Sequence, residues 1–153
     1  MKLTEHFDVT EFEHDGPMPA ECLAPYTSLC EKLLEPIRTH YGEPIVVTSG
    51  YRSPAANAAA HGVANSQHVA TVNYCAADWY LASMHADMRP VFDLIRGSAG
   101  LEFDQVILEH GADGDIIHTS WSRTFNRREA LEGATANQSA YTRWPTIPAS
   151  ADA

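Results

Sequence analysis

The segment from Ser66 to Asp78 constrains the fold more than any other part of the chain. It contains His68 and, ten residues later, Asp78, which begins the apolar run Trp79–Leu81. A second histidine, His118, lies inside another apolar segment far along the chain. Two His side chains and one Asp form a three-ligand zinc site when a fold brings them together. The sequence therefore predicts that a loop, the start of one strand and a later strand converge.

Length and charge limit the classes of protein to which this chain can belong. Its 153 residues are 44% hydrophobic and 20% charged, which is ordinary for one globular domain with a substantial core. It has 10 Lys and Arg residues against 20 Asp and Glu residues, so its formal net charge is −10. We expect no nucleic-acid partner, because phosphate binding requires a basic face. We also expect a monomer.

The cysteines and the N-terminus bear on the cellular compartment. Cys22, Cys30 and Cys75 are an odd set without the close pairs of a disulfide framework. We expect three buried thiols in a chain made in a reducing compartment. The first residues lack the apolar stretch of a secretory signal, and no apolar run is long enough for a membrane helix. The sequence predicts synthesis in the cytoplasm without a signal peptide, and no membrane span.

The first 41 residues are predicted to form an arm and a helix. Residues 1–20 form an extended arm with apolar anchors at Phe7, Val9 and Phe12. Residues 20–41 have apolar side chains at three- and four-residue spacing, which predicts a helix with one apolar face. We expect Pro36 to kink this helix or to tighten its last turn.

The later elements are shorter, and they set the fold class. In chain order the patterns predict a strand over 44–49, a helix over 55–60 capped by Ser53, a loop over 63–74, a strand over 76–81, a helix from Ser83 to about Arg96, and a hairpin with strands over 103–109 and 115–121. This order favours an α+β fold with a small, mainly antiparallel sheet flanked by helices.

The C-terminal part of the chain differs in composition from the rest. Residues 132–153 are rich in Ala, Thr, Ser, Asn and Pro, which predicts a loosely attached tail after a single domain over 1–131. Tyr141 and Trp144 are candidate anchors for part of this tail.

Candidate catalytic groups lie near the predicted ligands. A peptidase with a zinc ion also needs a carboxylate to accept a proton from the attacking water. Asp115 precedes His118 by three residues, and Glu109 ends the partner strand of the hairpin. We prefer Asp115 because its spacing to the ligand is short and fixed. Arg52, between a strand and a helix, is a candidate for binding a substrate carboxylate or carbonyl.

Each of these residues also has an ordinary structural interpretation. Asp78 can cap a strand, Asp115 can be a turn residue and Arg52 can form a salt bridge. The histidines to which we assign no role are His14, His40, His61, His85 and His110.

A series of short segments resembles a known enzyme family. The segments, in chain order, are Ser49–Pro54, Asn65–His68, Ala76–Asp78, Phe103–Glu109 and Ile117–Ser120. Together they resemble the zinc D-alanyl-D-alanine carboxypeptidases of the LAS metallopeptidases, whose fold is shared with hedgehog proteins. The likeness is greatest to phage and prophage members, and it covers about residues 7–131.

The resemblance implies a function and a set of site residues. The implied function is hydrolysis of the peptide stem of bacterial peptidoglycan, as a D-Ala-D-Ala carboxypeptidase or an endolysin-type endopeptidase. The protein would then act on the cell wall or in the periplasm, during phage or prophage lysis or as part of a virion. The implied residues are His68, Asp78 and His118 as zinc ligands, Asp115 or Glu109 as general base, Arg52 for substrate positioning and the oxyanion, and Ser66 lining the substrate site.

Two departures from the family pattern leave an alternative open. The spacing from His68 to Asp78 is three residues longer than in the family, and Ile116 stands where many members carry a second His. A longer spacing that separated the ligands would give a non-catalytic virion or cell-wall-binding module of the same fold. Bound zinc and hydrolysis of wall peptides distinguish the enzyme from this alternative.

Overall fold

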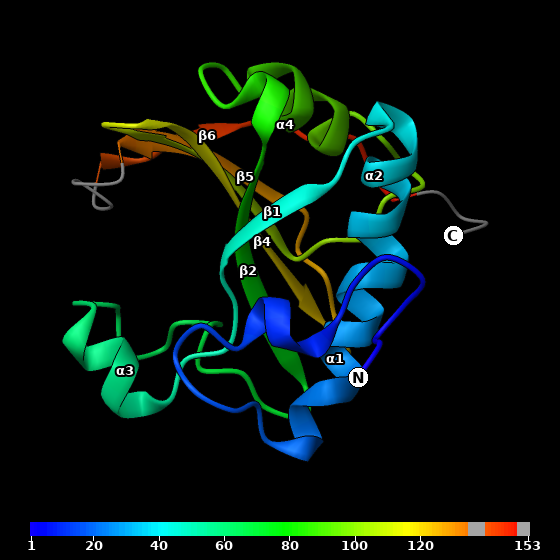
Figure 1. The fold of residues 1–153 in the computed structure, drawn as a ribbon. Helices are drawn as coiled ribbons and strands as arrows, with labels where there is room; N and C mark the ends of the chain where they lie inside the picture. The colour runs from blue at the N-terminus through cyan, green and yellow to red at the C-terminus, as the bar shows by residue number, and fades with distance from the viewer. Residues whose placement is uncertain (135–139, 150–153) are drawn as a thin grey trace.

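The protein forms one sheet with helices packed against it (Figure 1). The computed structural model describes residues 1–134 and 140–149. Within these residues the sheet has six strands in the order β1-β2-β4-β3-β5-β6. The strands are β1 (Ile45–Ser49), β2 (Tyr74–Leu81), β3 (Gln105–Gly111), β4 (Gly114–Ser122), β5 (Glu129–Ala134) and β6 (Thr142–Trp144).

The helices are short, apart from one composite helix near the N-terminus. They are η1 (Val9–Phe12), η2 (Ala20–Cys22), α1 (Leu23–Leu29), η3 (Cys30–Leu34), α2 (Glu35–Tyr41), α3 (Pro54–Ala59), η4 (Ala82–Met84) and α4 (Arg89–Arg96). All neighbouring strands are antiparallel except β3 and β5, which are parallel. The predicted α+β class with a mainly antiparallel sheet is confirmed.

The composite helix runs through η2, α1, η3 and α2, as the apolar spacing predicts. We expect Pro36 to kink the helix or to tighten its last turn, and the structure shows a wider π-turn over Cys30–Leu34 just before this proline. Pro36 has no backbone N–H, and its ring collides with the carbonyl four residues earlier in a regular α-helix. A wider turn just before the proline relieves that collision. Gly42 ends the helix with a left-handed backbone, at φ 68°.

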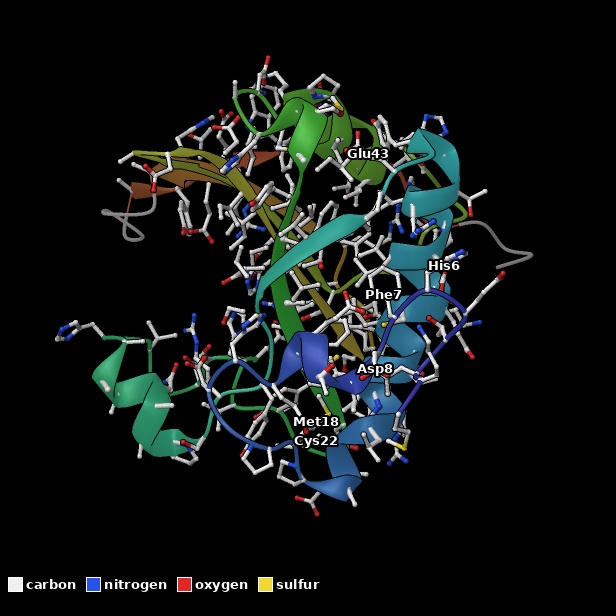
Figure 2. The ribbon with its side chains drawn as sticks, in the orientation of Figure 1. His6, Phe7, Asp8, Met18, Cys22 and Glu43 are labelled. Carbon is white, nitrogen blue, oxygen red and sulfur yellow. The ribbon has the colours of Figure 1, made fainter. Side chains whose placement is uncertain are left out.

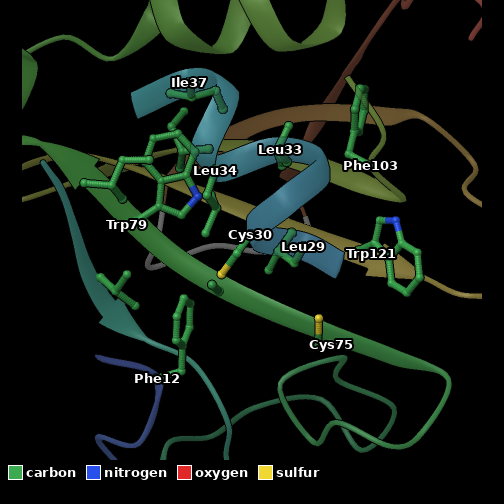
Figure 3. Packing of buried hydrophobic residues seen from close by; sticks show 14 of the residues in the cluster. Phe12, Leu29, Cys30, Leu33, Leu34, Ile37, Cys75, Trp79, Phe103 and Trp121 are labelled. Carbon is green, nitrogen blue, oxygen red and sulfur yellow. The ribbon is translucent and has the colours of Figure 1, made fainter. Parts of the chain in front are cut away.

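The hydrophobic core lies between this helix and one face of the sheet (Figure 3). Leu29, Leu33 and Ile37 from the helix are fully buried, as is Trp79 from β2. Side chains alternate between the two faces of a strand, so the residues on either side of Trp79 point away from the core. The opposite face of β2 is therefore free to carry Asp78.

The N-terminal arm packs beside α1 and reaches the segment that follows β1. Figure 2 shows Phe7 and Asp8 on the arm next to the helix. Phe12 is fully buried, and its carbonyl accepts a hydrogen bond of 2.9 Å from the backbone N–H of Tyr51. A Cβ at Gly50 would lie 2.6 Å from the same carbonyl oxygen, so only glycine permits this approach. The arm thus fixes the backbone just before Arg52.

The second long helix begins later than the sequence predicts. We expected a helix from Ser83, but residues 82–84 form a single 3-10 turn and α4 begins at Arg89. Pro90 is the reason, because proline is accommodated in the first turn of a helix and not in its interior. The carboxylate of Asp115 accepts the N–H of Met88 at 2.9 Å, next to the first turn of α4.

The C-terminal residues are more closely attached than the sequence predicts. β5 continues to Ala134 along β3, and β6 pairs with β5. The Trp144 indole N–H donates to Glu132 at 2.9 Å, and the guanidinium groups of Arg89 and Arg96 lie 5.3 and 4.9 Å from the ring centroid. Residues 135–139 and 150–153 of the predicted tail lie outside the described residues.

The three cysteines are buried and free, which confirms that part of the prediction. Among the described residues, no helix has both the length and the apolar character that crossing a membrane requires.

Removing the Phe12 ring tests whether the arm is an integral part of the core. We expect Phe12→Ala to lower the free energy of unfolding by about 3–5 kcal/mol, because it leaves a cavity against Tyr26 and Phe7. Urea denaturation measures the change. Phe125→Ala is the matched control, since Phe125 is 74% exposed and its loss should change stability by no more than about 0.5 kcal/mol. Equal effects of the two substitutions would show that the arm does not contribute to the core.

Candidate metal centre

Three side chains converge on the face of the sheet opposite the core. His68 Nε2 lies 3.2 Å from Oδ1 of Asp78, and His118 Nδ1 lies 2.8 Å from the same oxygen. In each of the three residues, one atom that could bind a metal lies within 4.8 Å of such an atom in the other two. The imidazole rings meet edge to face with centroids 5.2 Å apart. The structure thus brings together the residues that the sequence singles out as ligands.

The register of the sheet and one turn produce this convergence. Asp78 of β2 is directly paired with His118 of β4, so their side chains project from the same face. Between His68 and Asp78, the N–H of Thr71 donates to the carbonyl of Tyr74, and β2 begins at that tyrosine. The turn formed by residues 71–74 accommodates the extra residues between His68 and Asp78. The longer spacing therefore does not separate the two side chains.

The orientation of His68 is set by the backbone around Gly50. Its Nδ1 lies 2.8 Å from the Gly50 carbonyl, and its own carbonyl accepts the N–H of Arg52 at 2.8 Å. A carbonyl can only accept, so Nδ1 carries the proton of the neutral ring. The lone pair of Nε2 then faces Asp78 and His118, which is the tautomer that a metal ligand requires.

Charge and burial act in opposite directions on these groups. Burial by itself would raise the pKa of Asp78, but the charges and hydrogen bonds of His68 and His118 hold it far below its ordinary value. Burial disfavours protonated His68, yet the neighbouring Asp78 carboxylate raises the pKa of the imidazole. The group thus has the character of a partly buried anion held by two basic rings.

This donor set fits a zinc ion. Two imidazole nitrogens and one carboxylate oxygen are ligands that zinc uses, and three protein ligands leave a coordination position open for a water or a substrate. The hydrogen bond from His68 to a backbone carbonyl is the outer contact common to metal-binding histidines. His68, Asp78 and His118 are the residues that would hold the ion.

The three residues lie in the wall of a cavity of about 530 Å³. Arg52, Ser66 and Glu109, the candidates from the sequence for substrate binding and catalysis, also line this cavity. Arg52 extends between two carboxylates, with Nε 3.7 Å from Asp15 and Nη2 3.8 Å from Asp78. Arg52 therefore forms ion pairs with Asp15 and Asp78, and it also lies in the wall of the cavity, where a substrate could contact it.

The hydroxyl of Ser66 organises the loop that carries His68. Its oxygen accepts the N–H of His68 at 3.3 Å. Ser66 therefore both lines the cavity and supports the backbone of the adjacent ligand.

Glu109 and Asp115 lie on opposite faces of the sheet. Ile107 pairs with His118, and Glu109 follows two residues later on β3, so Glu109 shares the face of the ligands. Asp115 is three residues from His118 on one strand, an odd number, and it projects to the other face. The preference for Asp115 as the base therefore does not agree with the geometry, which places Glu109 in the cavity and Asp115 outside its lining.

The environment of Glu109 suits a proton acceptor. Its side chain is buried, and burial, followed by the charge of Asp78, raises its pKa above the ordinary value for glutamate. A carboxyl group with a raised pKa is a better base near neutral pH than an exposed one.

Asp115 belongs to a separate cluster at the end of the hairpin. Its Oδ1 lies 2.7 Å from Nδ1 of His110, and Nε2 of the same ring lies 2.7 Å from Glu132. Glu132 also pairs with Arg89. His110, to which we assigned no role, thus links β3 to β4 and β5. The hydrogen bond to Glu132 is the main reason that the pKa of His110 is raised.

Some residues of the cavity are absent from the sequence-based set. Gln67 and Arg127 line the cavity, and both donate to the buried carboxylate of Asp104, Gln67 Nε2 at 2.9 Å and Arg127 Nη2 at 2.8 Å. These bonds tie the His68 loop to the segments before β3 and β5. Tyr141, expected only as an anchor of the tail, lines the cavity beside Glu109. Two features of the sequence could have pointed to these residues. Gln67 is next to His68, and Tyr141 is an aromatic residue in an otherwise polar tail.

The chain matches a known protein family over more than half of its length. The peptidase M15 family model matches residues 5–100. The matched residues include Arg52, His68 and Asp78 but end before Glu109 and His118. No curated protein matches the chain.

Loss of one ligand should abolish metal binding. We expect the purified wild-type chain to contain close to one zinc per chain and His118→Ala to contain almost none, because two remaining ligands bind weakly. Elemental analysis after dialysis measures the content. His110→Ala is the matched control, since this imidazole lies in the separate Asp115 cluster and its loss should leave the zinc content unchanged. Equal zinc in the two variants would place the metal elsewhere.

The His110 cluster should make stability depend on pH. Because the folded-state pKa of His110 is raised, its cation stabilises the fold below the ordinary pKa of about 6.5, and this contribution is lost as pH rises through the folded-state value. Glu132, with its pKa lowered to about 2, stays ionised throughout that range. We expect His110→Asn to lower the free energy of unfolding more near pH 6 than near pH 9.

Urea denaturation of the zinc-free protein at both pH values measures this difference. His61→Asn is the control, because His61 is exposed and has a left-handed backbone that asparagine tolerates. A pH-independent difference for His110→Asn would contradict the assigned charge pairing.

Proposed function

Because the chain belongs to the peptidase M15 family, we propose that it is a zinc-dependent peptidase that hydrolyses the peptide stem of bacterial peptidoglycan. The observation that carries this proposal is the convergence of His68, Asp78 and His118 beside Glu109 in one polar cavity. The family match supplies the reaction class, a metallopeptidase. The wall substrate comes from the resemblance to phage and prophage enzymes.

The residues of the cavity divide the work of peptide hydrolysis. His68, Asp78 and His118 would hold a zinc ion, which would supply a Lewis acid able to lower the pKa of water and polarise a carbonyl. Glu109 accepts the proton of the attacking water on its carboxylate and returns it to the leaving amine. Arg52 binds the substrate carbonyl or a carboxylate of the stem peptide through its guanidinium N–H groups.

The longer spacing between His68 and Asp78 was the reason to consider a non-catalytic binding module. The turn before β2 takes up residues of that spacing, and both side chains still meet at 3.2 Å. The geometry therefore favours the peptidase. A role in the cell wall or periplasm, in phage or prophage lysis or in a virion, follows from the proposed substrate.

Replacing each carboxylate in turn tests the assignment of the base. We expect Glu109→Gln to lower kcat/KM for purified muropeptides by about 10²–10⁴-fold, because the amide cannot accept the proton. Zinc content should remain that of the wild type, since Glu109 is not in the ligand group. Chromatography of the digestion products measures the rate and also distinguishes released D-Ala from longer fragments.

Asp115→Asn is the matched control for this experiment. It makes the same change of carboxylate to amide on the opposite face of the sheet, so we expect its kcat/KM to stay within a few-fold of the wild type. The reverse result, with Asp115→Asn inactive and Glu109→Gln active, would restore Asp115 as the base. Failure of the zinc-loaded wild type to cleave any muropeptide would exclude the proposed substrate.

A further inference from the structure

Tyr141 is brought to the cavity by the last strands of the sheet. Thr142 of β6 pairs with Glu132 of β5 in an antiparallel register. Continuing this register by one residue sets Tyr141 opposite Gly133. Tyr141 is also one of the residues that line the cavity. It lies outside residues 5–100, to which the family match extends.

Three neighbouring strands place Glu109, Gly133 and Tyr141 in one row. The parallel register of β3 and β5 pairs Glu109 with Gly133. A Cβ at Gly133 would overlap Cδ1 of Tyr141, so the tyrosine ring lies directly on the glycine backbone. The absence of a side chain on β5 allows a residue beside β6 to extend across that strand toward β3.

This row directs the Tyr141 side chain toward Glu109, and both residues line the cavity. A phenol hydroxyl there can donate to the Glu109 carboxylate, and Tyr141 acts to lower the pKa of Glu109, which burial raises. Burial, followed by the charge of Glu109, raises the pKa of Tyr141, so the phenol remains protonated and able to donate. A carboxylate fixed by one donor has fewer orientations than one that is free to rotate.

Packing alone accounts for only part of this arrangement. An aromatic ring that covers a strand glycine stabilises a sheet without any catalytic role. That explanation uses the ring of Tyr141 and gives no function to its hydroxyl. Among the described residues, Glu109 is the carboxylate that lines the cavity outside the ligand group, and its place in the same row as Tyr141 points to a second role for the hydroxyl.

We propose that Tyr141 is a positioning residue whose hydroxyl holds the Glu109 carboxylate in the orientation that accepts the proton of the attacking water. Gly133 is required because a side chain there would displace the tyrosine ring. The inference rests on the proposed function, because it assigns to Tyr141 a part in the reaction that Glu109 serves.

Tyr141→Phe separates the two roles, since it keeps the ring and removes only the hydroxyl. We expect kcat for muropeptide hydrolysis to fall about ten- to a hundred-fold, which is the usual effect of losing a hydrogen bond to a charged group. KM, zinc content and Tm should stay close to wild-type values. Trp144→Phe is the control, because Trp144 anchors β6 through Glu132 and does not line the cavity. We expect its kcat to be unchanged.

A double-mutant cycle with Gly133→Ala tests the coupling. We expect Gly133→Ala to lower kcat as Tyr141→Phe does, and the double variant to lose little more than either single variant. A kcat for Tyr141→Phe within twofold of the wild type would overturn the inference, as would a change confined to KM, which would mark the hydroxyl as a substrate contact. A wild type that cleaves no muropeptide would overturn the proposed function and this inference with it, so the two failures are distinguishable.

Discussion

The site depends on one register in the sheet, in which Asp78 of β2 pairs with His118 of β4. This pairing puts a carboxylate and an imidazole on the same face of the sheet, and the Gly50 backbone holds His68 against them. A slip of one residue in β2 would turn Asp78 toward the core and Trp79 toward the cavity. Burial of Trp79, whose indole N–H donates to Thr119 at 3.0 Å, therefore fixes the register that the ligands require. The same contacts that stabilise the core position the ligand group.

The alternation of side chains along a strand also places Glu109 and Asp115, the two carboxylates of the hairpin, on opposite faces of the sheet. Glu109 lies in the cavity, whereas Asp115 binds the N–H of Met88 and the ring of His110 on the other side. The two acids are close in sequence, yet one is available for chemistry and the other joins α4 to the hairpin. The acidic groups near a predicted ligand cannot be ranked by sequence distance, because the parity of their spacing decides which face they occupy.

Much of this arrangement could be predicted from the sequence, and the exceptions have physical causes. The candidate ligands were identifiable because His118 interrupts a strongly apolar strand and Asp78 directly precedes the apolar run Trp79–Leu81. Asp115 was preferred because a short spacing suggested proximity, but that spacing is odd in a strand. The apolar spacing predicts a helix from Ser83, but Pro90 is accommodated only in the first turn of a helix, so α4 begins at Arg89. β5 was missed because its residues, Glu129–Ala134, alternate weakly, and its pairing with β3 is a long-range contact that no local pattern reports.

The C-terminal strands give the site its remaining wall. The family match ends at residue 100, within the part of the chain that holds Arg52, His68 and Asp78. The third ligand and Glu109 come from the hairpin that follows, and Leu131 and Tyr141 line the cavity from β5 and the residue before β6. β5 pairs with β3 and β6 pairs with β5, so a row of residues runs from Glu109 on β3 across β5 to the outer edge of the sheet. Changes at this edge can alter the cavity while the ligand group stays in place. The residues that would hold a metal thus lie on different segments of the chain from Leu131 and Tyr141, which shape the part of the cavity beside them.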